Sequence, residues 1–179
     1  MKNNEDKIML GHGSGGRLMH KLIEELIIRH FDNPILKEQT DAAILTTGSQ
    51  QIAFTTDSFV IDPLFFPGGN IGKLSVCGTV NDLAVSGAEP LYLSVSMIIE
   101  EGFPIKDLET IVASLAAEAN KAGVLIVTGD TKVVNKGKCD KLFINTAGIG
   151  RIKKEDLNIC KAENCMRRGA GCKMRQSSR

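Results

Sequence analysis

A glycine-rich segment and four aspartates are the residues of this chain whose types and spacing suit chemistry on phosphate groups. The segment Gly11-His12-Gly13-Ser14-Gly15-Gly16 precedes a predicted helix, and backbone N–H groups of such a loop form a cradle for phosphate oxygens. It also satisfies the dinucleotide pattern G-x-G-x-x-G, but a predicted hairpin follows where a dinucleotide fold needs a parallel strand. The chain has no Gly-Lys-Ser/Thr of a Walker A loop. A glycine turn without a ligand is the alternative interpretation.

The four aspartates each lie beside small or hydroxylated residues, at the edge of a predicted element or within one. They are Asp41, Asp57, Asp82 and Asp130. Mg²⁺ takes a few protein carboxylates and fills its remaining positions with phosphate oxygens and water, so carboxylates near a phosphate cradle suit a magnesium nucleotide. Asp82 is expected inside a helix among apolar residues, where a carboxylate is costly unless a cation meets it. Taken singly, each aspartate is more simply a cap or a surface residue.

Three further residues are candidates for chemistry, each with a simpler alternative. Lys132 follows Gly129-Asp130-Thr131 and would neutralise charge on a transferred phosphoryl group, or else is a surface lysine at a strand end. His12 is a candidate general acid or base, or a solvated loop residue. Cys77 is most simply a core residue.

Hydrophobic periodicity predicts the elements that must position these residues. Strands are expected over 8–10, 42–46, 51–56, 90–100, 124–128 and 142–149, with 132–134 extending the sheet, and helices over 18–31, 71–86 and 108–122. The runs 42–46 and 51–56 are predicted to form an antiparallel hairpin, and 124–128 a short buried strand. Residues 62–69 should be a loop, Asn70 should cap the second helix, and Gly123 should end the third.

Composition excludes several classes of protein. At 42% hydrophobic and 24% charged residues, the 179-residue chain is globular. Residues 1–150 hold 13 basic and 18 acidic residues and residues 151–179 hold 9 and 3, yet this basic end has no aromatic residue to stack on nucleic-acid bases. The start lacks a signal-peptide core and no apolar run approaches a membrane span, so the protein is expected in the cytoplasm. The five cysteines match neither a disulfide framework nor a zinc pattern.

Five segments together resemble the HypE family of hydrogenase maturation carbamoyl dehydratases, over about residues 8 to 152. They are Gly11-His12-Gly13-Ser14-Gly15-Gly16-Arg17, residues 55–60 (TTDSFV), 65–74 (FFPGGNIGKL), 76–84 (VCGTVNDLA) and 129–134 (GDTKVV). Selenophosphate synthetase and thiamine-monophosphate kinase, from the same aminoimidazole ribonucleotide synthetase superfamily, share the aspartates but not FFPGG or GDTKVV. The resemblance is therefore specific.

The resemblance implies an α+β fold of the PurM N-terminal type, a mixed and mostly antiparallel sheet with helices on one face that dimerises into a β-barrel. It implies that ATP and Mg²⁺ bind near that interface. The implied magnesium and phosphate ligands are Asp41, Asp57, Asp82 and Asp130; the implied nucleotide-binding residues are Gly13, Ser14, Gly15, Gly16, Asn81 and Thr131; and Lys132 is the implied catalytic residue.

In this family ATP activates a carbamoyl group carried as a thiocarbamate on a C-terminal cysteine, and loss of phosphate leaves a thiocyanate. The cyanide ligand is destined for the iron of [NiFe] hydrogenase. The implied partners are a second copy of the chain, a HypF-type carbamoyltransferase and a HypC–HypD-type scaffold complex, with no nucleic acid and no membrane.

The sequence departs from the family in its C-terminal part. A domain over 1–157 is expected, followed by a disordered or non-native basic tail over 158–179 that ends in Ser178-Arg179 rather than in cysteine. A truncation or frame change would explain this and would impair dehydration. The alternatives are a non-catalytic domain that dimerises or docks a partner, and another ATP-dependent small-molecule kinase or synthetase of the superfamily.

Overall fold

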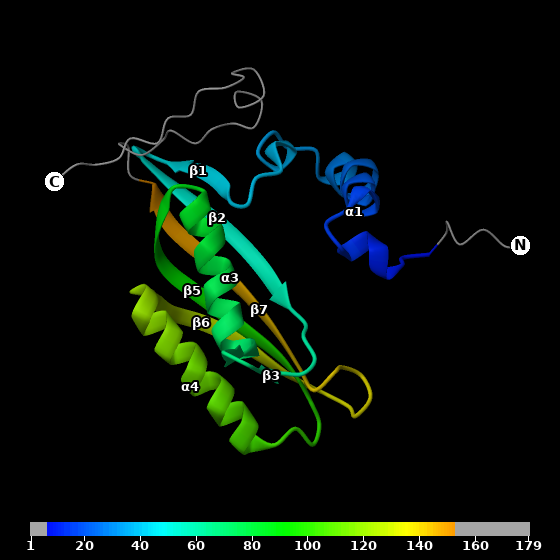
Figure 1. The fold of residues 1–179 in the computed structure, drawn as a ribbon. Coiled ribbons are helices and arrows are strands. Elements are labelled where there is room, and N and C mark those ends of the chain that lie inside the picture. The colour runs from blue at the N-terminus through cyan, green and yellow to red at the C-terminus, as the bar shows by residue number, and fades with distance from the viewer. Residues whose placement is uncertain (1–6, 153–179) are drawn as a thin grey trace, which may run out of the picture.

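A five-stranded sheet forms the centre of the fold in the computed structural model, which describes residues 7–152. The strand order is β1 (Ala43–Thr47), β2 (Gln50–Phe59), β7 (Leu142–Ile152), β5 (Ala88–Glu100) and β6 (Leu125–Val134). All neighbours are antiparallel except β5 and β6. Helices α3 (Ile71–Val85) and α4 (Ile105–Ala122) cover one face of the sheet (Figure 1). The predicted α+β fold, with a mostly antiparallel sheet and helices on one face, is confirmed.

Local sequence signals set the limits of both helices. The Asn70 side chain accepts a hydrogen bond from the backbone N–H of Lys73 at 3.1 Å, so Asn70 caps α3 as predicted. Gly123 ends α4 in the left-handed region, with φ of 68°, which is the predicted glycine stop. The expected loop before α3 is confirmed, although it contains a short hairpin of β3 (Phe65–Phe66) and β4 (Gly69–Asn70).

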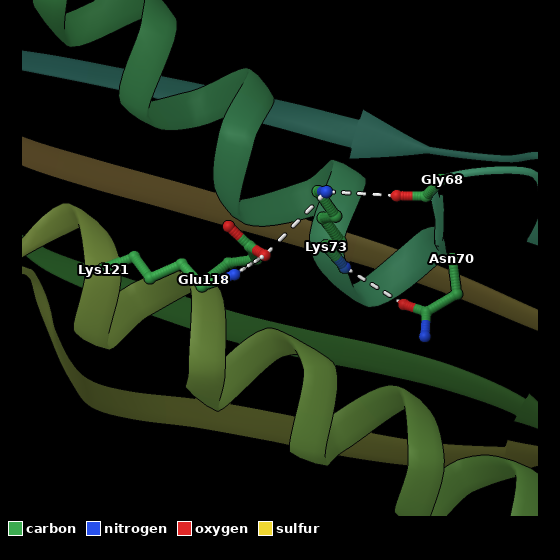
Figure 2. Close-up of polar contacts among 5 residues, drawn as sticks. All are labelled: Gly68, Asn70, Lys73, Glu118 and Lys121. Atoms are coloured by element: carbon green, nitrogen blue, oxygen red, sulfur yellow. Dashed lines mark hydrogen bonds and ion pairs between the residues drawn. The ribbon is translucent and has the colours of Figure 1, made fainter.

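A polar cluster ties this hairpin and the two helices together (Figure 2). The Lys73 ammonium donates to the Gly68 carbonyl at 3.0 Å and lies 4.0 Å from a Glu118 carboxylate oxygen of α4. Lys121 donates to the same oxygen at 2.8 Å, and this hydrogen bond is the main reason that the pKa of Glu118 is lowered. A side chain at Gly72 would lie 2.3 Å from the Ile111 carbonyl oxygen, so the helices pack as closely as glycine allows.

Helix α3 buries hydroxyl groups against the sheet as well as apolar side chains. Ser75, Thr79 and Thr146 are fully buried. The Thr79 and Thr146 hydroxyls hydrogen-bond to each other, and Thr146 donates onward to the Ser75 carbonyl at 3.3 Å. The same helix leaves Leu74 and Val85 exposed. Its buried face is therefore partly polar, and every buried hydroxyl in it has a partner.

The N-terminal part of the described chain is helical and lies apart from the sheet (Figure 1). The predicted strand over 8–10 is wrong, because Leu10–Gly13 is a 3-10 helix in which the Met9 backbone N–H donates to His12 Nδ1 at 3.0 Å, and no strand lies beside it. The expected helix is confirmed as α1 (Arg17–Leu22), a π-helical turn (Ile23–Ile28) and α2 (Arg29–Phe31). Its apolar side chains are largely exposed, with Phe31 at 68%.

Strand β6 differs most from its prediction. The predicted strand at 124–128 and the run 132–134, which was expected to extend the sheet, belong to one strand, and that strand is not buried. Only Val124, just before it, is buried, whereas Leu125 is 63% exposed. The reason is position: β6 is the edge strand of the sheet, so it lacks a neighbour on one side.

The face of the sheet opposite the helices is open. Tyr92 and Ile149 lie opposite each other on it, and Phe54 pairs with Ile149 from β2. All three are more than a third exposed, as is Ile98 further along β5. Between residues 7 and 152, no helix is long and apolar enough to cross a bilayer. The expected boundary at 157 and the tail at 158–179 lie outside the described residues and stay predictions.

Candidate functional site

Three of the four aspartates meet where β2, α3 and the segment before β1 come together. Thr55 of β2 is at their centre, and its side chain is buried. Its hydroxyl lies 2.9 Å from the Asp41 carbonyl oxygen and 3.2 Å from a carboxylate oxygen of Asp82. Asp57 follows two residues later on the same face of β2 and lies against α3, because a side chain at Gly78 would come within 3.2 Å of its carboxylate.

These carboxylates act on one another electrostatically. Burial is the main cause that raises the pKa of Asp82, and the negative charges of Asp57 and Asp41 raise it further. The hydrogen bond from Thr55 acts in the opposite direction. The site therefore concentrates negative charge around one partly buried carboxylate, and a cation there would be stabilised.

The donor set suits a magnesium ion that arrives with phosphate better than a resident metal. Within residues 7–152, no three His, Cys, Asp or Glu side chains are arranged as a ready-made metal cage. Mg²⁺ is commonly bound through one or two carboxylates, with phosphate oxygens and water completing its octahedron. Asp57 and Asp82 supply carboxylate oxygens beside α3, and Asp41 is near enough for its charge to act on Asp82, so these residues are of the type that Mg²⁺ prefers.

The fourth aspartate is elsewhere. Asp130 lies within β6, opposite Ser96 of β5, and two strands separate β6 from β2. Thr131 and Lys132 follow Asp130 in β6, and Lys132 lies opposite Ile98 of β5. Asp130, Thr131 and Lys132 are all exposed. A single chain therefore does not bring Asp130, Thr131 or Lys132 to the other aspartates.

The glycine segment opens a helix, as the sequence indicates. Gly13 ends the 3-10 helix, Ser14 donates to the Gly11 carbonyl at 3.0 Å, Gly15 has a φ of +76°, and Gly16 is the N-cap of α1. In Figure 1 this segment lies away from the sheet, so one chain does not join it to the aspartates.

Of two residues beside the aspartates, Asn81 was predicted from the sequence as a site residue and Thr55 was not. Asn81 is exposed on α3 next to Asp82. Thr55 was not among the predicted site residues. The signal that could have found it is strand alternation, which puts Thr55 and Asp57 on one face of β2.

Comparison with known proteins identifies the family. Residues 39–152 match the family described as AIR synthase related protein, N-terminal domain. The chain belongs to this family. The thiamine monophosphate kinase of Aquifex aeolicus has the same fold, with a TM-score of 0.61 at 16% identity over 76% of this chain and 44% of that one. This confirms the PurM-like fold.

Curated relatives confirm the resemblance to HypE. The chain is 57% identical to carbamoyl dehydratase HypE of Escherichia coli strain K12 over 152 residues, which are 82% of this chain and 45% of the relative. It is 55% identical to HypE of Rhizobium leguminosarum bv. viciae over 144 residues, 80% and 41% of the two chains. The chain thus spans less than half the length of these relatives.

Solved HypE structures are similar in fold and in sequence. The HypE–HypF complex matches with a TM-score of 0.69 at 56% identity, over 74% of this chain and 43% of that one. HypE in complex with ATP matches with a TM-score of 0.58 at 55% identity, over 83% and 44%.

Proposed function

We propose that this chain is the nucleotide-binding part of a HypE-type hydrogenase maturation protein and that it binds ATP with Mg²⁺ at the aspartates around Thr55. The observation that carries the proposal is the convergence of Asp41, Asp57 and Asp82, from three elements, in a chain more than half identical to HypE. The fact that a HypE structure holds ATP supports the choice of ligand.

In the proposed site the chain's own residues have separate tasks. Asp82 and Asp57 would hold the metal with the phosphate oxygens, and Thr55 would keep Asp82 and the Asp41 backbone in place. When bound, Mg²⁺ would neutralise the phosphate charge. From the family resemblance we also propose that Gly13, Ser14, Gly15 and Gly16 donate backbone N–H groups to phosphate, although a single chain does not join this segment to the aspartates.

The reaction proposed for the whole protein is the ATP-dependent dehydration of a cysteine-bound carbamoyl group to thiocyanate, for the cyanide ligands of [NiFe] hydrogenase. The HypF-type carbamoyltransferase is proposed as a partner because a HypE–HypF complex is known. A HypC–HypD-type scaffold and a cytoplasmic location are proposed from the family resemblance.

A homodimer through the open face of the sheet is part of the proposal. Phe54, Tyr92, Ile98 and Ile149 form an apolar surface on that face, and a second copy would remove them from water. Such a dimer would also give Asp130 and Lys132 of one protomer a route to the nucleotide of its partner, which a single chain does not offer.

Calorimetric titration of the whole chain with ATP, with and without Mg²⁺, tests the proposal when light scattering fixes the oligomeric state. Magnesium-dependent binding to a dimer is the expected result. A folded dimer that binds no ATP would overturn the proposal and would favour the alternative of a docking domain without nucleotide chemistry.

A further inference from the structure

Asn145 is a polar residue of strand β7, in the middle of the sheet, and its side chain lies on the open face. Asparagine is depleted in strands, and here its amide makes specific contacts. The amide nitrogen lies 2.8 Å from the Asp57 carbonyl oxygen and 3.0 Å from the Ser58 hydroxyl, whereas the Thr56 hydroxyl is 3.4 Å away. All three acceptors belong to β2, so Asn145 ties β7 to the part of β2 that carries Asp57.

One peptide group connects this contact to the Asp57 carboxylate. The Asp57 carbonyl and the Ser58 N–H belong to the same peptide group, which is planar and rigid. Asn145 donates to the carbonyl, and the N–H donates to Oδ1 of the Asp57 carboxylate at 3.2 Å. A contact that fixes the carbonyl therefore also fixes the direction of the N–H, and with it the carboxylate. The other carboxylate oxygen, Oδ2, is the one that lies toward Gly78 of α3.

We propose that Asn145 is a positioning residue for the Asp57 carboxylate, an inference that rests on the proposed function. Its amide acts through the peptide group between Asp57 and Ser58, from the face of the sheet opposite the helices. Asn145 supplies no ligand to the metal. Its effect is to hold Asp57 in one orientation, in which Oδ1 accepts the Ser58 N–H and Oδ2 is presented to Mg²⁺ beside α3.

The next residue of β7 acts on the other side of the sheet. The Thr146 hydroxyl hydrogen-bonds to Thr79 of α3, and Asp82 follows one helical turn after Thr79. Strand β7 therefore holds both α3, which carries Asp82, and β2, which carries Asp57. Asn145 is the contact that bears on Asp57, so its removal should affect the metal site without releasing α3.

Calorimetry on the full chain tests this role by comparing ATP affinity with and without Mg²⁺. Asn145→Leu keeps the shape of the side chain and removes its N–H donors. It should reduce the gain in ATP affinity on adding Mg²⁺ by on the order of tenfold, the lower end of the cost of losing a group that orients a metal ligand, and leave metal-free ATP binding unchanged. Asn145→Ala, which adds no apolar surface, should give the same result.

The matched control is Ser96→Ala. Ser96 lies opposite Asn145 on β5, the neighbouring strand on the other side, so the change alters the same face without touching the contact to β2. It should change neither affinity. If both variants lose the gain and light scattering shows a changed oligomeric state, the face acts through association and the positioning role is overturned.

A double variant shows whether Asn145 acts through Asp57. In the Asp57→Asn background, Asn145→Leu should reduce the remaining gain no further, because the carboxylate that it positions is already absent. The same fold-loss with and without the Asp57 carboxylate would overturn the proposal, since Asn145 would then affect the site by another route.

Two outcomes separate this inference from the proposed function. If Mg²⁺ strengthens ATP binding equally in the wild type and in Asn145→Leu, or if the variant loses metal-free ATP binding to the same extent, the positioning role is overturned and the proposed function stands. A wild-type chain whose ATP affinity does not respond to Mg²⁺ would refute the proposed function itself and this inference with it.

Discussion

Replacing Thr55 with valine removes the hydroxyl whose single proton is shared between the Asp82 carboxylate of α3 and the backbone carbonyl of Asp41, and almost nothing else. The hydroxyl lies 2.9 Å from the Asp41 carbonyl and 3.2 Å from the Asp82 carboxylate, and the side chain is 6% exposed. A hydrogen bond to a charged group contributes about 1.5–3 kcal/mol. Because Asp82 is only partly buried and can recruit water, we expect a loss of about 2 kcal/mol, or roughly 4–8 °C in melting temperature for a chain of this size.

The serine variant separates positioning from packing. Thr55→Ser keeps the hydroxyl and loses one buried methyl group, which costs about 1 kcal/mol. Thermal unfolding followed by circular dichroism gives the two stabilities, and calorimetry with Mg-ATP gives the two affinities. We expect the valine variant to lose most of the magnesium-dependent binding and the serine variant to retain it. Equal affinity losses in both would refute the view that the hydroxyl positions Asp82 and Asp41.

Two further predictions concern charges. Because the pKa of Asp82 is raised above its ordinary value of 3.8, first by burial, its stabilising contribution is complete below that pH and is lost as pH rises through the folded-state pKa. Asp82→Asn should therefore unfold at the same or a higher temperature than the wild type at pH 7. The difference in melting temperature should disappear below about pH 4. A variant that is less stable than the wild type at pH 7 would contradict this prediction. Lys132→Ala should slow phosphate release from ATP more than it weakens ATP binding, and equal losses would show that Lys132 only holds phosphate.

Elements with local signals were predictable from the sequence. The hairpin of β1 and β2 follows from two β-prone runs around Gly48, and α3 and α4 follow from their periodicity together with the Asn70 cap and the Gly123 stop. Such signals depend on neighbours along the chain, so they survive whatever the tertiary context is. The expected strand at 8–10 failed because its three apolar residues have no strand beside them.

Features that depend on strand order were not predictable. An apolar run such as 124–128 gives no sign of whether it will be central or at an edge, and β6 is exposed because it is at the edge. The position of the site depends on strand order for the same reason: the sequence groups Asp130 with the other aspartates, whereas two strands of the sheet, β7 and β5, lie between its strand and β2. Thr55 gains its role only when α3 packs on the sheet and brings Asp82 to it.

Asp41, Asp57 and Asp82 are proposed to bind a magnesium nucleotide together. The most direct test is to measure the gain in ATP affinity on adding Mg²⁺ for the wild type and for Asp82→Asn side by side. We predict that Mg²⁺ strengthens ATP binding to the wild-type chain and that most of this gain disappears in the variant, while the fold is unchanged. The same gain in both chains would contradict the claim, because the metal would then be held without Asp82.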